Sequence, residues 1–429
     1  MAVFSVPKEI LHIRTDGYNV LYNPEMHSWD YLTDEELVLY RSIQKNGSID
    51  HLRFSRELQT SLFRFVLKGL LYHGTSPPLV EKEKAFPESP SAVYWAITNS
   101  CNLHCIYCFA DASPSMLRRL NTRQAFAALE SILTSNPQWV YFTGGEPLLE
   151  NDLFDLACFC KDTGVRTGLL TNATLITPRT AQRIACSFDS VAISLDSLTP
   201  EIHDALRGPG THRRTLRGLL LLLEHGVRPA INTTVTRMNI DEIPALANWV
   251  RQLGLDEHRL SIHMAVGRGK NDGLGCDESR LLWLLQRVIQ QGAWLNLKKT
   301  SYSVFQASLP KPFKPKCQCG LGTNELLVDG MGNVFPCRLL CHESFLAGNV
   351  LRQPLCHIYN TSRVLLECRT IDVEDIPICR NCNYRYFCGG GCRALAFHAT
   401  GDITAPLLDM CNVYKREFDF MLAQEPLER

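Results

Sequence analysis

The 429-residue sequence predicts an α/β protein built around a parallel sheet, and three observations lead to this fold class. Short apolar segments alternate with amphipathic helical patterns through the middle of the chain, and repeated strand–helix units imply a parallel sheet. More than half of the 18 cysteines lie in the last third of the chain, where this alternation fades, which indicates a separate, metal-organised region. A proline-rich, charged stretch sets a smaller N-terminal segment apart from both.

The N-terminal segment carries no catalytic motif, and a linker follows it. The linker contains Pro77 and Pro78, the charged residues 81–84, and then Pro87 and Pro90. The elements expected before it are strands Ile10–Arg14 and Tyr18–Tyr22 and helices near Asp34–Ile43 and Ser55–Leu67. Together with the change of pattern near residue 300, this predicts three domains, at residues 1–88, 89–300 and 301–429.

The middle of the chain contains six expected strands. They are Val93–Thr98, Trp139–Thr143, Arg166–Thr171, Ser190–Ser194, Ala230–Val235 and Arg259–Met264. Helical patterns lie between them, such as Thr122–Leu133 and Arg213–His225, the second of which is stopped by Gly226. A Rossmann-type winding is compatible with this alternation, but no G-x-G-x-x-G follows the first strand.

The overall composition narrows the classes of function. With 44 basic and 44 acidic residues the formal net charge is zero, so no electrostatic argument favours a nucleic acid as partner. The longest aliphatic run, Leu219–Leu223, is far too short to span a membrane, and the first ten residues do not predict a signal peptide. We therefore expect a cytoplasmic protein whose cysteines bind metal in a reducing compartment.

Three cysteines directly after the first expected strand form the most informative motif. Cys101, Cys105 and Cys108 have the spacing C-x3-C-x2-C. Three thiolates this close can hold three corners of a [4Fe–4S] cluster and leave its fourth iron open. A structural zinc site is the alternative, but such sites use four ligands in paired C-x2-C groups. His104 lies between two of the cysteines, where it cannot easily share their metal.

This spacing resembles the radical S-adenosylmethionine (AdoMet) enzymes. The resemblance implies a partial, open (β/α)6 barrel with the cysteines at the carboxyl ends of its strands. It also implies that the open iron chelates the amino and carboxylate groups of AdoMet, and that an electron donor such as flavodoxin or ferredoxin reduces the cluster. AdoMet is then split into methionine and a 5′-deoxyadenosyl radical, so the cofactor carries the chemistry and the protein positions it.

Further segments match the AdoMet-binding motifs of this family. Gly144-Gly145-Glu146-Pro147 follows the second strand and is similar to the GGEP motif that meets the AdoMet amino group. Glycines let backbone carbonyls come close to an amine, and Glu146 adds an acceptor, although the same residues in isolation would be only a good turn. By family order, the other expected AdoMet contacts are Tyr107 at the adenine, Ser194, Arg207 at the carboxylate, Asn172 and Asn232.

The C-terminal cysteines form the pattern C-x2-C-x5-C-x3-C…C, preceded by G-x4-C. The pattern resembles the SPASM domain, which holds two auxiliary iron–sulfur clusters, and a pair of zinc sites is the alternative. By the family pattern the outer cluster is held by Cys379, Cys382, Cys388 and Cys411, and the inner one by Cys319, Cys337 and Cys392. Cys317 and Cys341 are rival fourth ligands of the inner cluster. The remaining cysteines are expected to be ordinary buried residues: Cys158, Cys160, Cys186, Cys276, Cys356 and Cys368.

The combined resemblance is to maturases of ribosomally made peptides and of sulfatases. It implies an oxidoreductase that abstracts hydrogen from a peptide or protein and leaves a crosslink, a thioether or a dehydrogenated residue. A radical step in tetrapyrrole or other cofactor biosynthesis is one alternative, and a non-catalytic metal-binding regulator is another. In sulfatase maturases an aspartate base follows the cysteine of G-x4-C, whereas Arg338 stands here and stays protonated. We therefore expect no formylglycine formation.

The first 85 residues resemble the small winged-helix domain with which peptide maturases bind a leader peptide. That domain adds the leader as an extra strand to its sheet. A structural cap without a binding role is the alternative.

Overall fold

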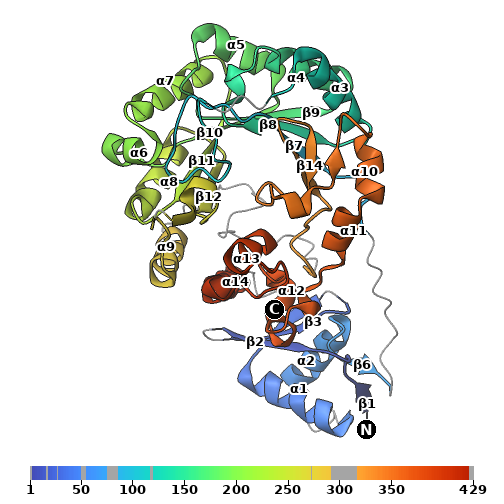
Figure 1. Ribbon diagram of the computed structural model, residues 1–429. Coiled ribbons are helices and arrows are strands. Elements are labelled where there is room, and N and C mark those ends of the chain that lie inside the picture. The colour runs from blue at the N-terminus through green and yellow to red at the C-terminus, as the bar shows by residue number, and fades with distance from the viewer. Residues whose placement is uncertain are drawn as a thin grey trace.

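The computed structural model describes residues 2–15, 18–26, 28–49, 55–74, 86–115, 119–271, 273–290 and 316–424. Within these ranges the chain forms one large sheet surrounded by helices, a C-terminal region beside it, and a small N-terminal unit at one end (Figure 1). Most of the expected linker, at residues 77–85, lies outside the described residues. No helix in the described ranges is long and apolar enough to cross a membrane.

Six parallel strands make up the greater part of the sheet. They are β7 (Ala92–Thr98), β8 (Trp139–Gly144), β9 (Arg166–Thr171), β10 (Ser190–Ser194), β11 (Ala230–Val235) and β12 (His258–Ile262). The strands lie side by side in chain order, and each neighbouring pair is parallel. A Rossmann sheet reverses its strand order at a switch point. The unbroken order therefore excludes that winding and confirms the open (β/α)6 barrel.

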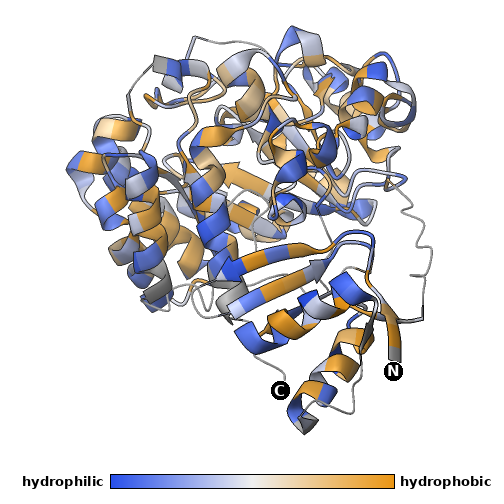
Figure 2. Ribbon diagram, turned by 90° about the horizontal axis from the view of Figure 1, so that it is seen from below, coloured by the Kyte–Doolittle hydropathy of each residue, from blue (hydrophilic) through white to orange (hydrophobic). Residues whose placement is uncertain are grey.

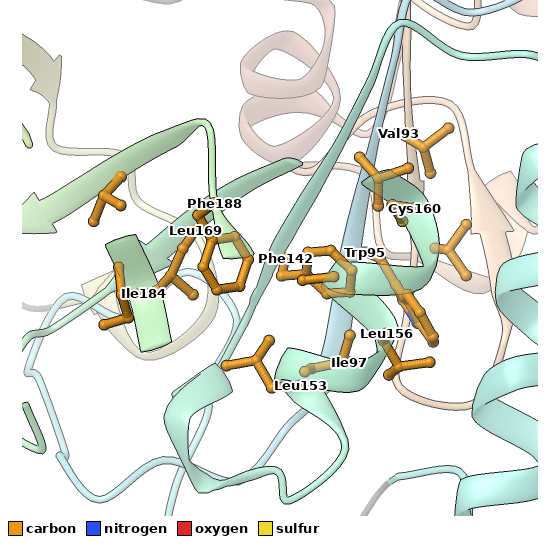
Figure 3. Close-up of a cluster of buried hydrophobic side chains, with 14 of the residues drawn as sticks. Val93, Trp95, Ile97, Phe142, Leu153, Leu156, Cys160, Leu169, Ile184 and Phe188 are labelled. Carbon is orange, nitrogen blue, oxygen red and sulfur yellow. The ribbon is translucent and has the colours of Figure 1, made fainter. Parts of the chain in front are cut away.

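Helices cover the outer face of this barrel. They are α3 (Thr122–Leu133), α4 (Leu153–Asp162), α5 (Pro178–Ser187), α6 (Pro200–Arg207), α7 (Thr211–Glu224), α8 (Ile243–Gln252) and α9 (Glu278–Gln290). The expected helix at residues 122–133 is confirmed, and a capping box between Asn121 and Gln124 starts it. Trp95, Phe142 and Phe188 lie in the apolar layer between strands and helices (Figure 3).

Two cysteines on these helices correct the sequence analysis. Cys158 on α4 and Cys186 on α5 are exposed, although they were expected to be buried. The buried face of α4 carries Cys160 instead, at 0% exposure. The two exposed thiols lie on the solvent-facing sides of amphipathic helices. Amino-acid composition alone does not predict on which side of a helix a cysteine lies.

The C-terminal region continues the barrel sheet. Strand β13 (Glu325–Val328) pairs with β7 in parallel, and β14 (Asn333–Phe335) and β15 (Gly348–Asn349) follow in antiparallel pairing. The remaining elements of the region are α10 (Leu355–Thr361), α11 (Arg363–Thr370), α12 (Arg385–Cys388), α13 (Arg393–Thr400) and α14 (Cys411–Gln424). The expected domain boundary near residue 300 stays a prediction. The large sheet contains strands from before this boundary and strands from after it.

The N-terminal unit (Ala2–His73) has its own small core. Its elements are β1 (Ala2–Ser5), β2 (Leu11–Thr15), β3 (Tyr18–Asn23), β4 (Ser28–Leu32), α1 (Asp34–Asn46), β5 (Ser48–Ile49), α2 (Arg56–Leu67) and β6 (Tyr72–His73). Strands β2, β3 and β4 form an antiparallel sheet, and α1 and α2 carry both apolar and polar residues, as amphipathic helices do (Figure 2). Tyr40, Phe65 and Leu70 are buried among them. The two expected strands, β2 and β3, and both helices are present, and β1, β4, β5 and β6 are additional strands.

Candidate active site

The three cysteines of the C-x3-C-x2-C motif lie together on the loop after β7. Cys101 belongs to a small buried cluster against which Cys105 and Cys108 pack. Burial raises the pKa of the Cys101 thiol to about 12, and the two neighbouring thiols add to the effect. A thiol in this setting stays protonated unless a metal binds it, because a coordinated thiol is deprotonated outright. None of the three forms a disulfide, so all three thiols are available as ligands, and that they hold a cluster stays a prediction.

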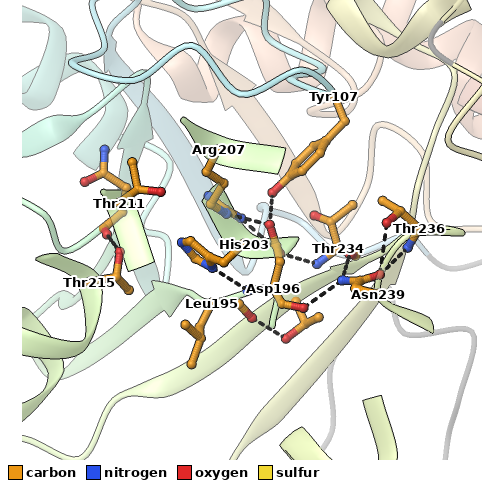
Figure 4. Close-up of polar contacts among 12 residues, drawn as sticks. Tyr107, Leu195, Asp196, His203, Arg207, Thr211, Thr215, Thr234, Thr236 and Asn239 are labelled. Atoms are coloured by element: carbon orange, nitrogen blue, oxygen red, sulfur yellow. Dashed lines mark hydrogen bonds and ion pairs between the residues drawn. The ribbon is translucent and has the colours of Figure 1, made fainter. Parts of the chain in front are cut away.

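A buried ion pair attaches this loop to the end of β10. Arg207 donates two hydrogen bonds to Asp196, from Nε at 2.6 Å and from Nη2 at 3.2 Å, and the Tyr107 hydroxyl donates to the same carboxylate (Figure 4). The backbone N–H of Thr234 donates to it at 3.0 Å. Burial alone would raise the pKa of Asp196, but Arg207 and these donors hold it below its ordinary value. The carboxylate is therefore charged and fully satisfied.

The structure thus brings together two residues that the sequence analysis had placed at AdoMet. The guanidinium carbon of Arg207 lies 5.4 Å from the centre of the Tyr107 ring, and both side chains are buried. Asp196, which joins them, was not predicted as a site residue. The sequence carried no local signal for this role, because the arginine that pairs with Asp196 comes from a separate helix.

The two glycines after β8 are packed against the start of the cysteine loop. Gly144 has a φ of +130°, and a Cβ on it would lie 2.2 Å from the Thr98 carbonyl oxygen. A Cβ on Gly145 would lie 2.0 Å from the Ser100 carbonyl oxygen. The backbone N–H of Gly145 donates to Thr98 at 2.8 Å. These positions therefore exclude any side chain, whether or not a ligand is present.

Glu146 is wholly buried and ties the end of β8 to that of β9. Its carboxylate accepts hydrogen bonds from the Thr171 hydroxyl at 2.7 Å and from the backbone N–H groups of Asn172 and Leu148 at 2.8 and 3.1 Å. The side-chain nitrogen of Asn172, Nδ2, in turn lies 3.9 Å from the Cys101 sulfur. Glu146 thereby positions a neighbour of the cysteine loop, and its contact with AdoMet stays a prediction, as do those of Ser194 and Asn232.

Arg268 is a site residue that the sequence analysis missed. It follows β12, and its side chain donates to the carbonyls of Cys105 and Ala112, both at 2.9 Å, and to Asp111 at 2.7 Å. Its own N–H donates to the Cys108 carbonyl at 3.0 Å. A Cβ on the preceding Gly267 would lie 2.6 Å from that carbonyl oxygen. The segment after the last barrel strand, β12, therefore holds the cysteine loop, which follows the first barrel strand, β7.

The inner face of the barrel carries a row of aromatic rings. Tyr94 stacks on Tyr141 with ring centres 4.8 Å apart, and Tyr141 stacks on Trp139 at 5.3 Å. Their neighbours in the strands face the helices, so these rings lie on the opposite side of the sheet. Arg338, from the C-terminal region, places its guanidinium carbon 4.0 Å from the centre of the Tyr94 ring. A cationic group thus reaches the barrel's inner face.

The C-terminal thiols fall into two groups within mutual electrostatic reach. Burial raises the pKa of Cys388 to about 12, and Cys379, Cys411 and Cys382 raise it further. Burial also raises the pKa of Cys392 to about 11, with Cys319 adding to it, and Cys319 and Cys392 both raise that of Cys337. The members of each group are those expected for the outer and for the inner ligand set, and their roles as ligands stay predictions. No group of three or more His, Cys, Asp or Glu side chains in the described ranges is spaced to hold one metal ion.

The candidates for a fourth inner ligand lie in different places. Cys317 packs in an apolar core with Cys379 and Cys388, on the side of the N-terminal unit. Cys341 lies within electrostatic reach of Asp329, and the buried Cys368 within reach of Cys319. The fourth inner ligand stays a prediction.

Comparison with known proteins agrees with this geometry. A family model described as the Radical SAM superfamily matches residues 95–250. The AdoMet-dependent heme synthase of Methanosarcina barkeri is 30% identical over 340 residues, which cover 74% of this chain and 95% of that protein. The mycofactocin maturase MftC of Mycolicibacterium smegmatis is 28% identical over 326 residues, which cover 75% of this chain and 82% of that protein.

A solved structure extends the likeness of fold. Streptococcus suis SuiB bound to precursor peptide SuiA superposes with a TM-score of 0.62 at 16% identity, covering 95% of this chain and 99% of that one. The identity with the heme synthase over nearly its full length shows that this chain belongs to the radical SAM superfamily. It is a radical SAM enzyme, and membership implies a [4Fe–4S] cluster and AdoMet.

Proposed function

We propose that this enzyme modifies a ribosomally made peptide or protein by hydrogen abstraction. Bound cluster and AdoMet supply the 5′-deoxyadenosyl radical, and the product is a crosslink, a thioether or a dehydrogenated residue. The observation that carries the proposal is the N-terminal unit. The fold likeness to SuiB, a protein solved with a precursor peptide, leaves out only 5% of this chain and therefore reaches into that unit.

The residues of the site have distinct tasks in this proposal. Cys101, Cys105 and Cys108 hold the cluster. The backbone of Gly144 and Gly145 meets the AdoMet amino group, and the remaining AdoMet contacts are those expected from the sequence: Tyr107, Glu146, Ser194 and Arg207. Asp196 and Arg268 are positioning residues. They hold the cysteine loop from two sides and so keep the thiols in place.

The auxiliary thiols extend the same proposal to three clusters. The outer cluster is held by Cys379, Cys382, Cys388 and Cys411, and the inner one by Cys319, Cys337 and Cys392 with a fourth ligand still to be assigned. The inner cluster would take an electron from the substrate radical or bind a substrate thiol. Flavodoxin or ferredoxin is the proposed electron donor, and the cytoplasm the proposed location.

The peptide's leader would bind to the sheet of the N-terminal unit. In the described residues β4 pairs with β3 on one side and with no strand on the other. At the other edge the C-terminal region makes a contact, since the Asn383 side chain donates to the His12 carbonyl of β2 at 2.8 Å, whereas the Tyr31 carbonyl of β4 accepts from Arg64 of α2, within the same unit, at 3.3 Å. Beside β4, helix α2 presents Phe63 and Leu67, which are 66% and 69% exposed. An extended leader along β4 would gain backbone hydrogen bonds from the strand and apolar contacts from the helix.

On the inner face of the barrel, Arg338 is proposed to bind the substrate peptide. Its guanidinium suits a carboxylate or a backbone carbonyl, and it lies beside the aromatic row. A tetrapyrrole or related cofactor precursor is the second candidate substrate, because the heme synthase is 30% identical over nearly its whole length. That match covers 74% of this chain, less than the share matched by SuiB.

The test is an anaerobic assay with the short peptides encoded beside the gene. Reductant and AdoMet should yield 5′-deoxyadenosine together with a peptide that has lost two hydrogens per new bond, as seen by mass spectrometry. The Cys101, Cys105 and Cys108 triple alanine variant is the control and should give neither product. A parallel reaction with an iron tetrapyrrole carrying propionates tests the second candidate. Conversion of the tetrapyrrole alone would refute the peptide proposal.

A further inference from the structure

A five-residue segment of the C-terminal region is the surface on which the N-terminal unit rests. This segment, residues 383–387, lies between Cys382 and Cys388. Tyr386 and Phe387 are buried in one apolar core with four residues of the N-terminal sheet: Leu11, Ile13, Val20 and Tyr22. Two regions more than 350 residues apart in sequence therefore share a core.

The contacts between the two parts are apolar and polar. The Tyr22 ring centre lies 5.3 Å from that of Phe387 and 6.4 Å from that of Tyr386. Arg385 forms an ion pair with Glu9, and Asn383 donates to the His12 carbonyl at 2.8 Å. Four of the five residues in the segment thus contact the N-terminal unit.

The segment contains three of the four residues of the single helical turn α12, and a cysteine of the outer ligand set flanks it on each side. Binding of a metal group to a site folds the segments that carry its ligands, because the unbound segments sample many conformations. A cluster held by the outer set would anchor the segment at both ends.

We propose that the outer auxiliary cluster seats the N-terminal unit by fixing residues 383–387. The inference rests on the proposed outer ligand set. It deepens the proposed function, since the peptide-binding unit would be held in position only in enzyme that carries this cluster.

Hydrogen exchange followed by mass spectrometry tests the proposal on anaerobically reconstituted full-length protein. The informative variant is Cys382→Ser with Cys411→Ser, because neither residue belongs to the shared apolar core. We expect its iron content to fall by about four per chain and the amides of β2 and β3 to exchange about tenfold faster. Helix α1, in the unit's own core, and strand β8 should keep their protection, which separates undocking from unfolding.

The matched control loses a cluster elsewhere. The triple alanine variant of Cys101, Cys105 and Cys108 should lose a similar amount of iron and leave the exchange of β2 and β3 unchanged. If the outer-set variant loses its iron while β2 and β3 keep their protection, the proposal is wrong.

A second variant approaches the coupling from the opposite side. Glu9→Gln with Asn383→Ala weakens the docking contacts and leaves every cysteine in place. Coupling between binding equilibria is reciprocal, so this variant should retain less iron than the parent enzyme at equilibrium with a chelator. Faster β2 exchange with unchanged iron retention at equilibrium would overturn the proposal. Neither measurement uses a substrate, so a negative peptide assay combined with a positive exchange result would refute the proposed function alone.

Discussion

Replacing Arg268 by alanine should loosen the loop that carries Cys101, Cys105 and Cys108. The side chain, 18% exposed, donates charge-assisted hydrogen bonds to two backbone carbonyls at 2.9 Å. At about 1.5 kcal/mol for each such bond, the variant loses about 3 kcal/mol of loop stability. The ion pair with Asp111 adds little, because that carboxylate is 56% exposed. A loss of 3 kcal/mol corresponds to roughly a hundredfold change in the equilibrium between closed and open loop.

The assay is the rate at which a chelator removes iron from the AdoMet-binding cluster, followed by the AdoMet-sensitive part of the reduced enzyme's EPR signal. Arg268→Ala should lose this signal roughly a hundred times faster than the parent enzyme, and Arg268→Lys about ten times faster, since an ammonium can serve only one carbonyl at a time. Arg280→Ala, which breaks an ion pair with Asp241 at an exposed position, is the control and should change nothing. Loss of the cluster from Arg268→Ala at the parental rate would refute the reasoning.

Four further predictions follow from the site. The reconstituted enzyme should contain on the order of twelve irons, and the Cys101, Cys105 and Cys108 triple alanine variant about four fewer, with no AdoMet cleavage; cleavage in that variant contradicts the assignment. Deletion of residues 1–85 should weaken peptide affinity while AdoMet cleavage without substrate persists, and unchanged affinity would make the segment a cap. A sulfatase-type Cys-x-Pro-x-Arg peptide should not become formylglycine, because Arg338 cannot act as a base; an aldehyde in the mass spectrum would show otherwise. Burial, with Arg207 nearby, lowers the pKa of His203 from 6.5 to about 4, so the unfolded chain binds a proton that the folded chain does not between these values. The free energy of unfolding in urea should therefore decrease as the pH falls from about 6.5 to 4, and His203→Gln should reduce that slope.

The six barrel strands could be predicted because fully buried parallel strands are short apolar runs bounded by helices. Strand β13 has the same apolar character over four residues, but no helical pattern flanks it, and only its pairing with β7 makes it part of the sheet. The motif cysteines were predictable for a similar reason, since their spacing is local.

The residues that hold the cysteine loop were less predictable. Arg268 and its partner Cys105 are 163 residues apart, and no periodicity links them. Asp196 was recognised only as part of a strand-end segment, because its role depends on an arginine that a separate helix brings to it. Such long-range polar contacts are set by tertiary structure rather than by local pattern.

The pairing of β13 with β7 has a consequence for recombining parts of this enzyme. A fragment that ended before the C-terminal region would leave the backbone N–H and C=O groups along one side of β7 without partners. Unpaired edges of this kind associate with other chains and promote aggregation. A chimera that exchanges the C-terminal region with that of a relative should therefore be joined after β15, so that residues 325–349 stay with the barrel whose sheet they complete.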